Sequence, residues 1–217
     1  MFGERPRMAH RPGKAEVSQK RVLDAAAKVF SENGYAGTTM RAIADKADLK
    51  AGSIYYHYKS KNDMLTAMLD RGMNSAIESV SHRLEGLPEG TSGLERLQTA
   101  IHAHLSSTIE NRDYTLATRR VFGQVPEDIR LKHMRLRNSY GKMWQKILCN
   151  AMEQGELRPD INLTLARLFV LGALNWTVEW FKPGSQTIDE VSDEFTSIVV
   201  NGIFNPTVAP ADTRAAE

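Results

Sequence analysis

The run of residues 38–61 constrains the fold of this chain more than any other stretch. Apolar residues recur in it at three-four spacing in two short groups, which predicts two short helices that each bury one face. Only residues 48–50 separate the two groups, and a turn of this length sets two helices near a right angle in a helix-turn-helix. A chain folded this way presents a helix that fits the major groove of DNA. The residues predicted to face inward are Met40, Ile43, Ala44 and Ala47 in the first helix and Ile54 and Tyr58 in the second.

The outward face of the second helix is the predicted DNA-binding face. A recognition helix contacts base edges through its N-terminal residues, while hydroxyls, backbone N–H groups and lysines bind phosphates. Small residues at positions 51 and 52 let the backbone approach the groove, and the tyrosines and the histidine that follow reach phosphate oxygens. The alternative is that the tyrosines only cap a small helical core. The predicted DNA-binding residues are Thr39, Arg41, Lys50, Ala51, Gly52, Ser53, Tyr55, Tyr56, His57 and Lys61.

This run resembles the DNA-binding domain of the TetR-type transcriptional regulators. The resemblance begins near Val17 and rests on the Thr38-Thr39 pair, on Ile43-Ala44 and on residues 55–61, which read Tyr-Tyr-His-Tyr-Lys-Ser-Lys. It implies a repressor that binds a palindromic operator as a homodimer. It also implies a larger helical domain that binds a small effector, with the movement reaching the DNA through the helix that follows the motif.

Two residues depart from the pattern of the family. Asp48 stands where the family usually has glycine, and Tyr58 stands where it usually has phenylalanine. Aspartate tolerates the left-handed conformation at a helix end better than most residues do. Tyrosine keeps the aromatic body and needs only a partner or water for its hydroxyl. Both departures are therefore compatible with the resemblance.

The predicted fold is all-α, with about nine helices in two domains. A basic flexible arm is expected over residues 1–16, the helix-turn-helix domain over 17–62, the effector-binding and dimerisation domain over 63–204, and a disordered tail over 205–217. The arm either lies along DNA or is only a solvated tail. No apolar run reaches the length of a membrane span and no secretory signal is recognisable, so the expected location is the cytoplasm, with no membrane partner.

Positive charge is concentrated in the N-terminal part of the chain. Residues 1–61 hold 12 Lys and Arg against 6 Asp and Glu, whereas residues 62–217 hold 16 against 20. This asymmetry predicts salt-dependent binding of double-stranded DNA at the N-terminal end. A nonspecific architectural DNA-binding protein without an effector response would also fit the charge and the motif, and the large second domain argues against it.

The sequence predicts no enzyme, metal site or cofactor. Cys149 is the only cysteine, which excludes an intrachain disulfide framework and a zinc site of the cysteine type. His102 and His104 are two residues apart and face different sides of a helix, and no His-Glu-x-x-His run occurs. Gly34 and Gly37 follow a helix rather than the strand that a nucleotide-binding loop requires.

The middle helices carry aromatic and polar residues that could line an apolar pocket with a few polar anchors. Each of them, taken alone, is as compatible with a place in the core or on the surface. The C-terminal half resembles the subgroup of repressors of lipid and steroid catabolism that respond to acyl-CoA, in residues 142–144, 153–160 and 180–184. A small apolar or acyl-CoA-type effector is therefore expected. The predicted pocket residues are His102, Arg119, Phe122, Tyr140, Trp144, Asn175 and Trp176.

The last predicted helix carries an apolar stripe at three-four spacing with acidic residues outside it. Such a stripe predicts a two-fold dimer in which the last two helices of each subunit form a four-helix bundle. The alternative is that the stripe packs only inside its own domain. The predicted interface residues are Ile188, Val191, Phe195, Ile198 and Gly202.

Overall fold

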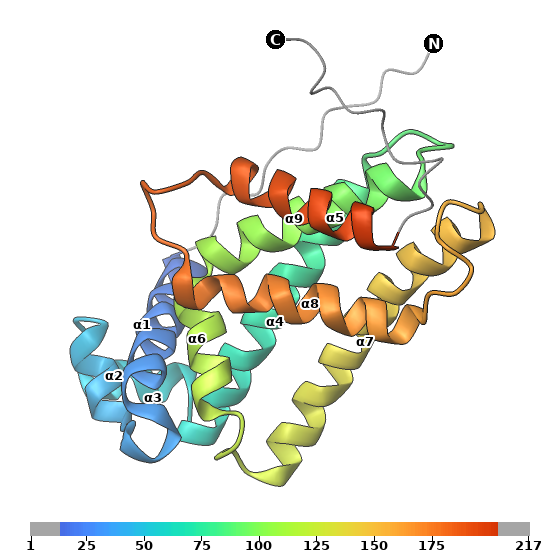
Figure 1. The fold of residues 1–217 in the computed structure, drawn as a ribbon. Helices are drawn as coiled ribbons and strands as arrows, with labels where there is room; N and C mark the ends of the chain where they lie inside the picture. The colour runs from blue at the N-terminus through green and yellow to red at the C-terminus, as the bar shows by residue number, and fades with distance from the viewer. Residues whose placement is uncertain (1–13, 204–217) are drawn as a thin grey trace, which may run out of the picture.

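The computed structural model describes residues 14–203, with side chains from residue 17 onward. Within this range the chain forms nine helices and no strand, which confirms the predicted all-α fold (Figure 1). The predicted arm and tail lie outside the described residues, except that residues 14–16 begin the first helix and are not part of an extended arm. The helices are α1 Lys14–Gly37, α2 Met40–Lys46, α3 Ala51–His57, α4 Lys61–Glu85, α5 Gly93–Glu110, α6 Arg112–Val121, α7 Glu127–Glu153, α8 Leu163–Trp180 and α9 Ile188–Ile203.

Helices α2 and α3 form the predicted helix-turn-helix. Thr39 begins α2, and its hydroxyl oxygen accepts a hydrogen bond from the backbone N–H of Ala42 at 3.1 Å. Thr38 is buried and donates to the carbonyl oxygen of Gly34 at 2.7 Å, which ties α2 to the end of α1. Ile54 and Tyr58 face the interior as predicted.

The core of the helix-turn-helix domain includes side chains from beyond residue 62. The first turns of α4 contribute Met64, Leu65, Met68 and Leu69, and α6 contributes further buried residues. A small helical domain buries too little surface to be stable without such additions. The predicted boundary at residues 62 and 63 therefore coincides with the start of α4, but the packing continues across it. The α6 residues in this core are Tyr114, Ala117 and Val121.

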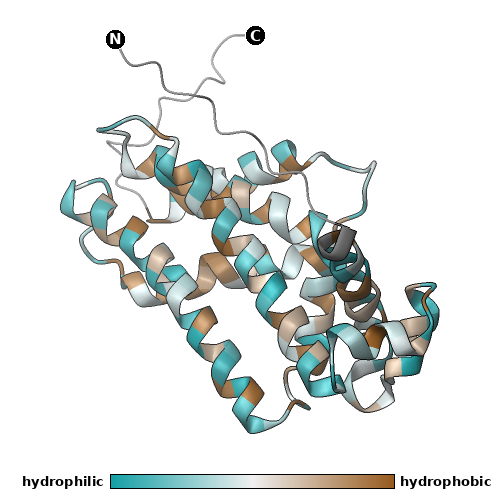
Figure 2. Ribbon diagram, turned by 180° about the vertical axis from the view of Figure 1, so that it is seen from behind, coloured by the Kyte–Doolittle hydropathy of each residue, from teal (hydrophilic) through white to brown (hydrophobic). Residues whose placement is uncertain are grey.

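A second core lies between α5, α7, α8 and α9, with the far end of α4 against it. Trp144 of α7 is fully buried near its centre, and Leu174 of α8 and Ile101 of α5 are also fully buried. Hydrophobic and hydrophilic residues alternate along the long helices, as expected for helices that bury one side (Figure 2). None of the helices in the described range combines the length and the apolar character needed to cross a membrane.

Side-chain caps define where the last helices begin. The Asn162 side chain accepts from the backbone N–H of Leu165 at 3.0 Å at the start of α8. Thr187 and Glu190 form a capping box before α9, since the Thr187 hydroxyl accepts from the Glu190 N–H and the Glu190 carboxylate accepts from the Thr187 N–H. This N–H and the Thr187 hydroxyl, which donates to the same carboxylate at 3.0 Å, lower the pKa of Glu190.

Asp48 adopts the left-handed conformation that the sequence comparison led us to expect, with φ of 53°. We predict that Asp48→Gly raises the free energy of unfolding by up to about 1 kcal/mol, because glycine has no Cβ to clash in this conformation. The ion pair of Asp48 with Arg21, at 3.2 Å, is largely exposed, so its loss should lower the free energy of unfolding only slightly. Thermal unfolding measures the effect. Asp45→Gly, within regular α2, is the control and should lower stability by about 1 kcal/mol.

Candidate DNA-binding surface and effector cavity

All the predicted DNA-binding residues except Lys61 lie on α2 and α3 or directly before these helices, and most of them are exposed. Arg41 is exposed on α2, and residues 50–53 are exposed at the start of α3. Tyr56 is 86% exposed, although a tyrosine ring usually packs against something. The ring of His57 meets that of Tyr56 edge-on at 5.1 Å between centroids, which restricts how both can turn. The exposed side chains of Arg41 and Tyr56 are therefore accessible to a ligand.

Lys61 is held differently from the other predicted DNA-binding residues. Its Nζ donates to the carbonyl oxygen of Tyr35 at 2.9 Å and lies 4.3 Å from the centre of the Tyr35 ring. These contacts join the start of α4 to the end of α1. A contact of Lys61 with phosphate would have to use the N–H groups that Tyr35 leaves free.

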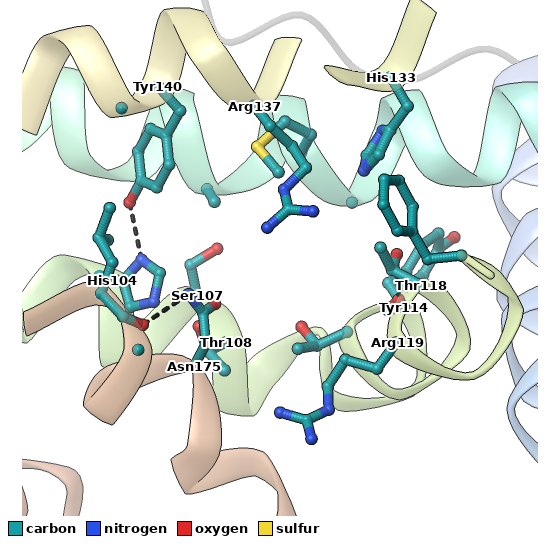
Figure 3. Close-up of a pocket in the computed structure, with 18 of the residues that line it drawn as sticks. His104, Ser107, Thr108, Tyr114, Thr118, Arg119, His133, Arg137, Tyr140 and Asn175 are labelled. Carbon is teal, nitrogen blue, oxygen red and sulfur yellow. Dashed lines mark hydrogen bonds between the residues drawn. The ribbon is translucent and has the colours of Figure 1, made fainter. Parts of the chain in front are cut away.

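A cavity of about 720 Å³ lies between α4, α5, α6, α7 and α8. Figure 3 shows side chains from several helices converging on it, with Tyr140 and His104 at one end and His133 at the other. Its apolar lining includes Met73 of α4, Phe122 after α6 and Leu171 of α8. Polar side chains such as Ser107, Asn111 and Thr118 line it as well, and a cavity of this size with apolar and polar groups on its wall is typical of a site for a small organic ligand.

The structure brings together four of the seven predicted pocket residues, namely Arg119, Phe122, Tyr140 and Asn175. The other three predicted residues lie outside this cavity. His102 lies outside the cavity, where its ring nitrogens contact Arg83 at 3.0 Å and Asp189 at 2.6 Å. Trp144 does not line the cavity because it is buried in the core beside Tyr140. Trp176 is 54% exposed on the outside of α8, with the guanidinium of Arg119 4.6 Å from the centre of its ring.

Two buried histidines that sequence reasoning did not select line the cavity. Nδ1 of His104 lies 2.7 Å from the hydroxyl of Tyr140, and the two rings stack at 5.8 Å. Burial lowers the pKa of His104 to about 4, against a smaller opposing effect of the Asn175 side chain. The two-residue spacing of His102 and His104 indicates that they lie on different sides of α5. It does not indicate which of the two faces the cavity.

His133 of α7 forms the opposite end of the cavity and is 2% exposed. Its ring meets the ring of Phe122 edge-on at 5.9 Å between centroids. Burial, together with the charge of Arg137, lowers the pKa of His133 to about 4, against an opposing effect of Asp70. Both histidines are therefore neutral near pH 7 and act as hydrogen-bonding groups rather than as cations.

Three arginines line the cavity and give it positive charge. Arg119 pairs with Glu179 at 3.2 Å, and Nε of Arg167 donates to Gln145 at 3.2 Å. The guanidinium of Arg137 lies 5.2 Å from the centre of the Phe122 ring. A cation beside an aromatic ring at a cavity edge suits an anionic group at the end of an apolar ligand.

Comparison with known proteins assigns both halves of the chain. Residues 22–68 match the family described as bacterial regulatory proteins of the tetR family, and residues 90–203 match the tetracyclin repressor-like C-terminal domain. The chain belongs to the TetR family. The HTH-type transcriptional repressor KstR2 of Rhodococcus jostii is 30% identical over 85% of this chain and 90% of its own length.

Solved structures show the same fold. The ketosteroid transcriptional regulator KstR2 of Mycobacterium tuberculosis superposes with a TM-score of 0.77 at 24% identity, over 92% of this chain and all of that chain. FadR of Bacillus subtilis, solved in complex with stearoyl-CoA, has a TM-score of 0.69 at 24% identity, over 85% of this chain and 99% of that chain. The predicted resemblance to the TetR family and to its lipid and steroid catabolism repressors is thereby confirmed.

This TetR-family chain also exposes an apolar surface on α8 and α9, which lie beside each other in Figure 1. The rings of Trp180 and Phe195 stack across the two helices at 6.4 Å. Val191, predicted at a dimer interface, is 4% exposed and packs in its own core, and Ile188 packs partly against the same core, so Val191 in particular has little surface left for a partner. We give the name α8/α9 surface to a set of residues that are exposed except for the half-buried Phe195, and of which Leu168 also lines the cavity: Leu165, Leu168, Phe169, Trp176, Trp180, Phe195, Ile198 and Gly202.

We predict that Tyr56→Ala weakens binding to a DNA site selected from random duplexes by about tenfold, because a hydrogen bond to a charged phosphate contributes roughly 1.5–3 kcal/mol. Gel shifts with the selected duplex measure the affinity. Asn74→Ala, exposed on α4 and away from this surface, is the control and should leave affinity unchanged. Unchanged affinity of Tyr56→Ala, with a normal melting temperature, would show that another face meets the DNA.

Proposed function

We propose that this chain is a repressor that binds a palindromic operator as a homodimer and releases it when an acyl-CoA-type effector enters the cavity. The observation that carries the proposal is the cavity, which joins an apolar interior to arginines on its wall. An acyl chain fits the apolar part, and phosphates of coenzyme A suit the arginines. The lipid-related names of the relatives and the stearoyl-CoA bound to FadR of Bacillus subtilis support this effector class.

Helix α6 offers a route from the cavity to the DNA-binding surface. Tyr114 lines the cavity, and its hydroxyl donates to Asp24 of α1 at 2.8 Å. Asp113, the neighbour of Tyr114 on α6, has a carboxylate oxygen 3.5 Å from Nζ of Lys28 on α1. A ligand that moves α6 therefore also moves α1. An effector needs only to bind one arrangement of α6 and α1 more tightly than the other to shift the equilibrium.

The function is tested with DNA and effector together. Selection from random duplex DNA should enrich two half-sites related by two-fold symmetry, and stearoyl-CoA should release the chain from that duplex in a gel shift. Enrichment of no sequence, with affinity that collapses as salt rises, would favour a nonspecific architectural protein.

We expect Arg137→Gln to raise the stearoyl-CoA concentration needed for release by at least about tenfold, since charged hydrogen bonds contribute roughly 1.5–3 kcal/mol. The ligand-induced rise in melting temperature should shrink in parallel. Arg130→Gln is the matched control, because Arg130 lies on the same helix, is exposed and does not line the cavity. An equal effect of both substitutions would show that the net charge of the protein, rather than a contact of Arg137 in the cavity, determines the response to stearoyl-CoA.

The α8/α9 surface is the proposed contact between two copies. Its exposed residues Leu165, Phe169, Trp176 and Trp180 follow one another at spacings of four and seven residues and so share one side of α8, whereas isolated exposed apolar residues are ordinary on a protein surface. A two-fold contact through this surface would place two DNA-binding surfaces in one assembly, as a palindromic operator requires.

We predict that Phe169→Glu converts the dimer to a monomer at micromolar concentration, because it places a charge in the middle of the apolar contact. Light scattering coupled to gel filtration measures the mass. Leu131→Glu is the control, since Leu131 is similarly exposed, at 52% against 61% for Phe169, but lies on α7. A dimer that survives Phe169→Glu would place the interface elsewhere.

A further inference from the structure

His133 has no hydrogen-bond partner for either ring nitrogen within the described range. A neutral imidazole always carries one N–H donor and one acceptor nitrogen, and water satisfies both in the unfolded chain. Buried polar groups in folded proteins are almost always paired, so two unpaired nitrogens on one side chain call for a partner. This partner is missing at a residue that lines the cavity between α4, α5, α6, α7 and α8.

The surroundings of His133 narrow the chemistry of that partner. The neighbouring charges are already engaged or distant from its nitrogens: Lys132 pairs with Asp70 at 2.8 Å, and the guanidinium of Arg137 lies over Phe122. The Phe122 ring packs edge-on against the imidazole, and both residues line the cavity, where Figure 3 shows His133 at one end. A rotation of Phe122 by a ligand would therefore open His133 to that ligand.

The other histidine of the cavity differs in this respect. His104 already uses one nitrogen for the hydroxyl of Tyr140. It lies at the opposite end of the cavity from His133 in Figure 3. Nε2 of His104 also has no partner within the described range, so the two histidines differ in that His104 has one unpaired nitrogen and His133 has two.

We propose that the effector carries a hydroxyl or keto oxygen on its apolar part and that His133 binds this oxygen. The inference rests on the proposed function and narrows the effector to oxygenated acyl groups rather than plain alkyl chains. A hydroxyl group donates to the acceptor nitrogen or accepts from the N–H, and a keto oxygen accepts from the N–H. A carboxylate at this position would favour an imidazolium, which the burial of His133 opposes.

The first test compares dodecanoyl-CoA with a set of hydroxydodecanoyl-CoA esters that carry the hydroxyl at successive chain positions. For the wild-type protein, at least one hydroxylated ester should bind at least about tenfold more tightly than dodecanoyl-CoA in calorimetry, since one extra hydrogen bond is gained. His133→Leu should abolish this preference, and His133→Gln, which keeps a donor and an acceptor, should retain part of it. His82→Leu, exposed on α4, is the control and should keep it in full. A preference that is absent, or that survives His133→Leu, overturns the inference.

The second test needs no ligand and separates this inference from the proposed effector class. Replacing a buried unpaired polar side chain with an apolar one of similar size relieves a desolvation penalty. The melting temperature of ligand-free His133→Leu should therefore rise by about 2–4 °C. If no ester of either kind changes the melting temperature of the wild type, the proposed acyl-CoA effector class is wrong. The inference about His133 is then judged only by the melting temperatures of the ligand-free variants. A fall for both His133→Leu and His133→Gln would show that His133 is paired in the free protein and would overturn the inference.

Discussion

The helix-turn-helix domain is too small to bury a core of its own, and the arrangement of the rest of the chain follows from this constraint. The domain completes its core with the first turns of α4 and with one side of α6. The other side of α6 forms part of the cavity wall. A ligand in the cavity therefore touches a helix that the DNA-binding domain needs for its own stability.

The parts of the fold that are determined locally could be predicted from the sequence. The three-four spacing of apolar residues predicted the two helices of the helix-turn-helix and an all-α chain of about nine helices, since this spacing depends on neighbours in the chain. The left-handed Asp48 followed from its place between two helices. The membership of α6 in the first core could not be predicted, because it depends on contacts between residues about ninety positions apart, such as Tyr114 with Asp24.

The cavity shows the limit of the same reasoning. Aromatic and polar residues in the middle helices indicated a pocket, but periodicity only tells which residues share a side of a helix. It placed His102 and Trp176 among the candidates, and both face outward, while His104 and His133 face inward. In α9 the apolar residues cover two sides of the helix, so Val191 and Ile198 looked alike in the sequence although one is buried and the other is 55% exposed.

The packing of α6 against α1 has a consequence for attempts to exchange parts between regulators. A hybrid protein joined near residue 62 would combine one DNA-binding domain with an α6 from a different protein. The side chains of Tyr114, Ala117 and Val121 would then meet a surface for which they have no complementary shape, and Asp24 would lose the Tyr114 hydroxyl. A functional transplant of DNA specificity onto this scaffold requires that the α1 residues facing α6 be carried over unchanged, while the exposed residues of α2 and α3 are exchanged.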